Sequence, residues 1–102
     1  MIDRDHLSAQ TFGDADLARE VLGLFVQQCS RLMPLIRDGS IEPGLRADHV
    51  HTLRGSAVGI GANAVSQVCA ILEDALRRNE PDEKALDRLS DAVDATVLAI
   101  AS

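Results

Sequence analysis

One imidazole in this sequence lies among residues that suit it to carrying a phosphoryl group. His51 is followed by Arg54 at position i+3 and by Gly55 at position i+4. A histidine side chain with an ordinary pKa of about 6.5 is largely neutral, and therefore nucleophilic, near neutral pH. A guanidinium one helical turn away can neutralise phosphoryl oxygens because its donors match phosphate geometry. These residues predict a nucleophile with a cation beside it.

The segment around His51 has the pattern of an amphipathic helix. If residues 45–60 are helical, each advances about 100° around the axis, and one side of the helix becomes apolar. That side is expected to form core and consists of Val50, Leu53, Ala57 and Ile60. His51 projects roughly opposite and shares its surface with Ala47, Arg54, Gly55, Val58 and, if the helix continues, Ala62. This surface carries little bulk around the imidazole, which predicts that another molecule approaches it.

Glycines strengthen that prediction. Gly55, Gly59 and Gly61 lie in or near this helix, and each glycine inside a helix costs about 0.5–1 kcal/mol relative to alanine. Gly55 leaves the His51 ring unshielded, and Val58 offers an exposed apolar contact. We therefore predict a docking patch for a protein partner, made of Ala47, Gly55, Val58, Gly59 and Ala62.

The elements that must position this patch are helices. Helical spacing of apolar residues predicts one helix from Asp14 to about Gly39, with a kink or a local loss of helical bonding before Pro34. Further helices are expected over about 44–59 or 44–61, over about 63–79, and from Pro81 and Asp82 onward; a short helix near residues 3–11 caps one end. Short links between long helices predict an all-α, antiparallel up-down four-helix bundle, a single domain over residues 1–102.

Composition excludes several classes of protein. The 102 residues include 46% hydrophobic residues, no Trp or Tyr and two Phe, which favours a helical core of aliphatic side chains. A net charge of −6 argues against nucleic acid or an anionic membrane as partner. The sequence shows neither a secretory signal nor a membrane-spanning run, so we expect a cytoplasmic monomer in which Cys29 and Cys69 stay reduced.

The residues around His51 also resemble a known family. The run His51-Thr52-Leu53-Arg54-Gly55-Ser56, followed by Gly61-Ala62 and later by Cys69 and Leu72-Glu73, resembles the histidine-containing phosphotransfer (HPt) domains of bacterial phosphorelays. The family pattern is roughly H-x-L-[KR]-G-S with a later G-A and L-E. Arg54 stands where lysine is commoner, and Val50 stands where alanine is frequent. The resemblance covers most of the chain, because the number and order of helices also fit.

The resemblance implies a phosphoryl shuttle. His51 would accept a phosphoryl group from the phospho-aspartate of one receiver domain and pass it to the aspartate of another, with Arg54 stabilising the group. A histidine kinase or hybrid kinase and response-regulator receiver domains would be the partners. Such proteins bind no cofactor and have no ATP-dependent kinase activity of their own, and the receiver supplies Mg²⁺. Ser56 and Glu73 are candidate supporting residues, and Glu73 is equally well read as a solvated helix residue.

Other interpretations remain open at this point. A non-catalytic helical adaptor could dock response regulators without being phosphorylated, and the face around His51 could instead form a dimer interface. His49 and His51 are spaced i, i+2 and diverge on a helix, so no metal site is expected. The glycine-rich segment 55–61 lacks the Gly-Lys-Ser/Thr signature of a nucleotide-binding loop.

Overall fold

Five helices account for most of the chain. A computed structural model describes residues 2–80 and 82–102. The helices are α1 (Arg4–Gln10), α2 (Ala15–Arg37), α3 (Pro43–Ile60), α4 (Asn63–Arg77) and α5 (Glu83–Ala101). This order confirms the predicted all-α class. The predicted start of the last helix at Pro81 lies outside the described residues.

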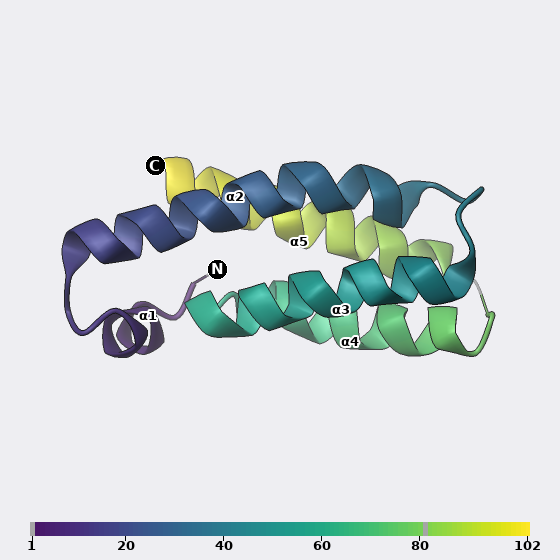
Figure 1. Cartoon of the computed structure of the whole chain (residues 1–102), viewed down its shortest axis with the longest axis horizontal. Helices are drawn as coiled ribbons and strands as arrows, with labels where there is room; N and C mark the ends of the chain where they lie inside the picture. The colour runs from purple at the N-terminus through teal and green to yellow at the C-terminus, as the bar shows by residue number, and fades with distance from the viewer. Residues whose placement is uncertain (1, 81) are drawn as a thin grey trace.

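The four long helices form an antiparallel up-down bundle (Figure 1). Each helix from α2 to α5 packs against the next one in the chain, and α5 closes the ring by contacting α2. α1 lies across one end, where it contacts α2 and α3. The bundle is elongated, with principal extents of 41 × 19 × 19 Å. The predicted four-helix bundle with a short N-terminal capping helix is confirmed.

Aspartate side chains begin three of the helices. Asp14 caps α2 by accepting hydrogen bonds from the backbone N–H groups of Asp16 and Leu17, and Asp3 and Asp82 cap α1 and α5 in the same manner. α2 ends at Arg37 because the Asp38 carboxylate accepts hydrogen bonds from the backbone and hydroxyl of Ser40. This local turn competes with the helix. The helix therefore ends slightly earlier than the predicted stop at Gly39.

Pro34 does not interrupt α2. The helix continues through Pro34 to Arg37, so the predicted disturbance does not divide it. Proline still lacks the N–H that would bond to a carbonyl one turn earlier. Only three residues follow it in the helix, and Met33 and Ile36 on either side are buried in the core. Packing of these neighbours holds the last turn in place.

The apolar side of α3 forms the middle of the core, as predicted. All four residues assigned to that side are buried with 2% exposure or less: Val50, Leu53, Ala57 and Ile60. Arg46 is also buried, because its Nε donates a hydrogen bond of 2.9 Å to the carbonyl oxygen of Ile36 at the end of α2. This bond satisfies an otherwise unpaired carbonyl at the helix terminus.

Gly61 ends α3 where the N-terminal segment crosses it. Gly61 has φ +74°, and a Cβ there would lie 2.8 Å from the Cβ of Asp3 and 2.9 Å from its carbonyl oxygen. The Asp3 N–H donates to the Gly61 carbonyl at 2.9 Å, and Ile2 and Ala62 form an isolated antiparallel bridge. Only glycine fits both the backbone conformation and the close approach.

Two residues of the predicted docking patch are buried, which corrects the prediction. Ala62 follows the left-handed Gly61, so it leaves the helix, pairs with Ile2 and has no exposed surface. Ala47 also has no exposed surface. α4 lies along that side of α3, as shown by the contact of Arg77 with Asp48, the residue after Ala47. A helix with neighbours on several sides buries a wider arc than its apolar stripe alone indicates.

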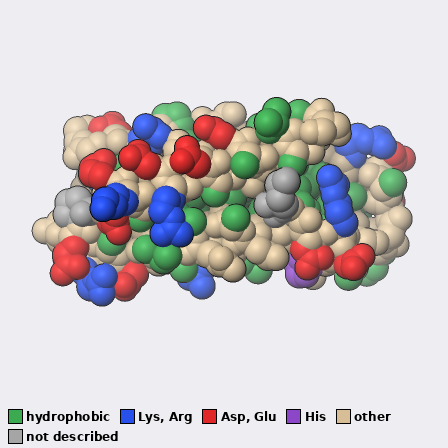
Figure 2. All heavy atoms as spheres, turned by 180° about the vertical axis from the view of Figure 1, so that it is seen from behind, with side chains coloured by type: hydrophobic (Ala, Val, Ile, Leu, Met, Phe, Trp, Pro, Cys, Tyr) green, Lys and Arg blue, Asp and Glu red, His purple; other side chains and the backbone are tan. Residues whose placement is uncertain are grey.

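The surface is charged and mixed in sign. On the face shown in Figure 2, acidic, basic and hydrophobic side chains are interspersed along the length of the molecule. Within residues 2–80 and 82–102, no helix combines the length and the apolar character needed to cross a membrane.

Candidate functional site

The His51 side chain projects from the middle of α3 into solvent beside α4. It is 66% exposed, and its Nδ1 lies 3.2 Å from Oε1 of Glu73 on α4. Within the described parts of the chain, no hydrogen-bond partner reaches its Nε2. The predicted exposure of the imidazole is confirmed, and one of its two nitrogens is left open to an incoming group.

Glu73 is the least exposed charged group at the site. Its side chain is only 13% exposed, and cations lie close to both of its oxygens. Oε1 is 3.8 Å from a guanidinium nitrogen of Arg54, and Oε2 accepts a hydrogen bond of 3.1 Å from Arg77 Nε. The two guanidinium groups therefore compensate the charge of a carboxylate that is largely removed from water. Of the two readings left open for Glu73, contact with the histidine is the one that the structure shows.

The contact with Glu73 sets the chemistry of the imidazole. An ionised carboxylate only accepts hydrogen bonds, so the Nδ1 of a neutral His51 carries the proton that Glu73 accepts. The lone pair then lies on Nε2, because the hydrogen bond made by one ring nitrogen fixes the state of the other. In that tautomer the ring presents a nucleophilic nitrogen to solvent, and its other nitrogen contacts the carboxylate of Glu73.

Gly55 has no packing role within the chain. A Cβ at Gly55 or Gly59 would meet no atom within 4 Å, and both residues are exposed. Val58, one turn beyond Arg54, is 53% exposed. The bundle itself therefore does not require glycine at position 55. Of the five residues predicted to form a docking patch, Gly55, Val58 and Gly59 are exposed, and Gly59 also lines a cavity between α1, α2 and α3.

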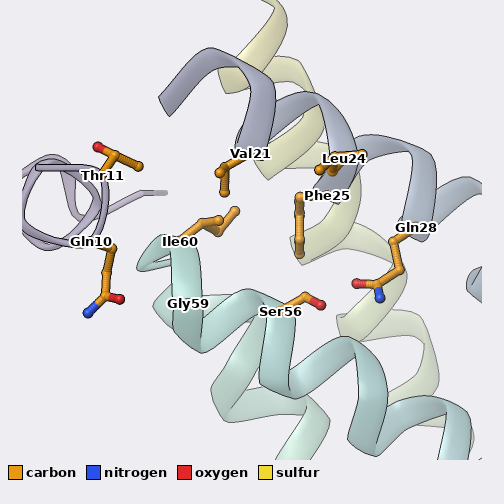
Figure 3. A pocket seen from close by; sticks show the side chains of 9 residues that line it. All are labelled: Gln10, Thr11, Val21, Leu24, Phe25, Gln28, Ser56, Gly59 and Ile60. Carbon is orange, nitrogen blue, oxygen red and sulfur yellow. The ribbon is translucent and has the colours of Figure 1, made fainter. Parts of the chain in front are cut away.

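Ser56 belongs to a different surface from His51. It lines a cavity of about 350 Å³ between α1, α2 and α3, and its side chain projects toward Gln28 of α2 (Figure 3). The Oε1 of Gln28 is buried and has no hydrogen-bond partner among the described residues. On the helix, His51 and Ser56 project in directions about 140° apart around the axis. Ser56 therefore does not support the imidazole directly.

Sequence reasoning missed two charged residues at the site. Arg77 donates hydrogen bonds of 3.2 Å from both terminal nitrogens to Oδ1 of Asp48, three residues before His51 on α3. The pKa of Arg77 is raised, first by its hydrogen bond to Glu73 and then by that to Asp48. The i, i+4 spacing of Glu73 and Arg77 is a visible signal of an ion pair. Their position opposite Asp48 required the packing of α4 on α3.

The other candidate ligands and nucleophiles do not form a site. His49 is half-buried and points away from His51, and among the described residues no group of three His, Cys, Asp or Glu side chains is placed to bind a metal. Burial raises the pKa of the Cys29 thiol to about 11 and that of Cys69 to about 12. Both thiols are therefore protonated and unreactive near neutral pH.

Comparison with known proteins agrees with this geometry. The family model of the Hpt domain matches residues 20–99. The crystal structure of the histidine phosphotransferase ShpA from Caulobacter crescentus is similar, with a TM-score of 0.74 and 31% sequence identity over 98% of this chain and 86% of that one. No curated protein sequence matches significantly. Together with a helical bundle that exposes one imidazole beside a carboxylate and a guanidinium, these similarities show that the chain belongs to the Hpt domain family of phosphorelay phosphotransfer proteins.

Proposed function

We propose that His51 is the phosphoryl-accepting residue of this phosphotransfer protein and that Nε2 is the accepting atom. The supporting observation is the 3.2 Å contact between His51 Nδ1 and Glu73 Oε1, which occupies one ring nitrogen and leaves the other free in solvent. The adaptor hypothesis is not favoured, because the family assignment and the exposed nucleophile both point to phosphotransfer.

The transfer step follows from this arrangement. The Nε2 lone pair attacks the phosphorus of a phospho-aspartate, the bond from phosphorus to the aspartate oxygen breaks, and the carboxylate leaves with the electron pair. The ring then carries the phosphoryl group on Nε2 and the proton on Nδ1, so it gains a positive charge. Glu73 accepts the hydrogen bond from Nδ1–H and lies where it stabilises that charge. Transfer to a second aspartate is the reverse sequence.

Arg54 is proposed to neutralise the phosphoryl oxygens. Its guanidinium is 45% exposed and only 3.8 Å from Glu73, a loose contact that it can leave for a bidentate contact with phosphate. Positioning and charge neutralisation supply most of the catalysis in phosphoryl transfer. We propose that the receiver domain brings the aspartate and Mg²⁺, and that a histidine kinase or hybrid kinase lies upstream in the same compartment, the cytoplasm.

Phosphate uptake by His51 variants tests this proposal. Incubation with a receiver domain phosphorylated by acetyl phosphate is expected to label the native chain with acid-labile phosphate and to leave His51→Gln unlabelled. His49→Gln and His6→Gln are matched controls, since both histidines lie outside the site, and they should label normally. Arg54→Ala should label about 10- to 100-fold more slowly, because it loses the cation at the developing charge. Labelling of His51→Gln would refute the assignment.

A further inference from the structure

Arg77 stands between two carboxylates on different helices. Its Nε donates to Oε2 of Glu73 at 3.1 Å on its own helix, α4, and its two terminal nitrogens donate to Oδ1 of Asp48 at 3.2 Å on α3. Asp48 lies one turn before His51, so Arg77 connects both helices at the level of the imidazole. We call Asp48, Arg54, Glu73 and Arg77 the charge network.

The two arginines of the charge network hold Glu73 differently. Arg77 makes a hydrogen bond with good geometry, whereas Arg54 approaches Oε1 only to 3.8 Å, beyond hydrogen-bond distance. Oε1 is therefore held mainly by His51, and Oε2 by Arg77. The four charges of the network also sum to zero, so the Glu73 carboxylate is compensated before a phosphoryl group arrives.

We infer that Arg77 is a positioning residue for phosphotransfer: braced by Asp48, it holds Glu73 with Oε1 on His51 Nδ1 and thereby leaves Arg54 free for the phosphoryl group. This inference rests on the proposed role of His51. Without Arg77, Arg54 is the nearest cation to the largely buried Glu73 carboxylate. The side chains of Arg54 and Glu73 then approach each other. His51 then loses its fixed partner, and the phosphoryl group has to compete with Glu73 for Arg54.

The tautomer of His51 gives a direct readout that does not depend on phosphorylation. Long-range ¹H–¹⁵N spectra of the unphosphorylated chain, recorded above the ordinary histidine pKa of about 6.5, distinguish a protonated from an unprotonated ring nitrogen. The native chain should show Nδ1 protonated and Nε2 unprotonated. Arg77→Ala should show a mixture in which the Nε2–H tautomer is substantially populated, and Arg77→Lys should recover much of the native pattern because it keeps the charge beside Glu73.

Arg78 provides a matched control on the same helix. Its guanidinium pairs with Asp74 at 3.2 Å and with Glu80 at 3.5 Å and makes no contact with the charge network. Arg78→Ala removes a similarly exposed arginine and should leave the His51 tautomer unchanged. Far-ultraviolet circular dichroism shows whether each variant keeps its helices, so a change in tautomer is separated from unfolding.

Transfer rates measure the competition for Arg54. Arg77→Ala should slow phosphotransfer about two- to fivefold, as expected for the loss of one partly exposed ion pair. In a chain that already carries Arg54→Ala, Arg77→Ala should slow phosphotransfer less, because the cation that Glu73 would draw away from the phosphoryl group is already absent. Additive effects of the two changes would overturn the proposed competition.

The two proposals fail separately. A native tautomer in folded Arg77→Ala refutes the positioning role even when His51 is phosphorylated normally. If His51→Gln still takes up phosphate while Arg77→Ala shifts the tautomer, the assignment of His51 fails and the hold of Arg77 on Glu73 stands.

Discussion

The two halves of the bundle are built differently. α3 and α4 form the most extensive contact between any two of the described helices. They carry small, fully buried residues such as Ala47, Ala57 and Cys69, and ion pairs connect the two helices. α5 instead crosses behind α2 (Figure 1) and leaves a groove of about 560 Å³, lined by Val26, Pro34, Val97, Leu98 and neighbouring residues.

This difference matches what each half has to do. The α3–α4 half carries His51, the proposed phosphoryl acceptor, and in-line transfer requires such a group to be held within a fraction of an ångström. We infer that the charge network holds the imidazole in one orientation through its contact with Glu73. Both halves bury apolar side chains in the common core, and the α2–α5 half in addition leaves apolar side chains such as Leu98 exposed beside its groove.

Truncation of one leucine in each half should give the largest contrast. Leu53 lies on the core side of α3 with no exposed surface, so Leu53→Ala should lower the free energy of unfolding by about 2–5 kcal/mol. Leu98 on α5 is 71% exposed, and Leu98→Ala should change the free energy of unfolding by no more than about 0.5 kcal/mol. Urea denaturation followed by circular dichroism measures both. Similar losses in the two variants would show that Leu98, beside the α2–α5 groove, is buried in solution.

A large side chain at position 55 should slow phosphotransfer without lowering the stability of the fold. Gly55→Gln places a long side chain beside His51, and we expect phosphotransfer from a receiver to slow about tenfold or more. The free energy of unfolding should rise by about 0.5–1 kcal/mol, because glycine disfavours a helix. Stopped-flow or quenched transfer assays and urea denaturation give the two quantities.

Gly23 is the matched control for that substitution. It lies within α2, and a Cβ there also meets no atom within 4 Å. Gly23→Gln should give a similar gain in stability with an unchanged transfer rate. If both variants transfer equally fast, the open surface at Gly55 has no role in docking.

The two cysteines report the smallest expected difference. Cys29 lines the α2–α5 groove, whereas Cys69 on α4 is fully buried, and burial raises its pKa to about 12 against about 11 for Cys29. Iodoacetamide should therefore label Cys29 several times faster than Cys69, as measured by mass spectrometry. Faster labelling of Cys69 would show that the α3–α4 half opens more readily.

The two thiols also make the stability of the fold depend on pH in a defined direction. Folding raises both pKa values above the ordinary value of 9.0, so the fold favours the protonated thiols. Their contribution to stability is complete below about pH 9 and is lost as the pH rises above it. Urea midpoints of the native chain and of Cys29→Ala, compared between neutral and alkaline pH, measure this dependence.

The sequence by itself determined the helices and where two of them begin. Helical spacing of apolar residues and the helix starts near Asp14 and Asp82 are local features, and the core side of α3 follows from its period. His51, Arg54 and Gly55 were also visible, because their relation depends on a single helical turn. Ala47 and Ala62 were assigned to the wrong side, since the helical pattern does not reveal which neighbours cover a small residue.

Only the tertiary structure decided which charges surround the imidazole. Glu73 and Arg77 lie more than 20 residues from His51. The family resemblance named Glu73 as a candidate supporting residue, but helical periodicity does not show which carboxylate or guanidinium reaches the imidazole. The packing of α4 against α3 brings Glu73 to Nδ1 and Arg77 to Asp48. Distances between side chains on different helices depend on rotation and register of the helices, which the pattern of a single helix does not contain.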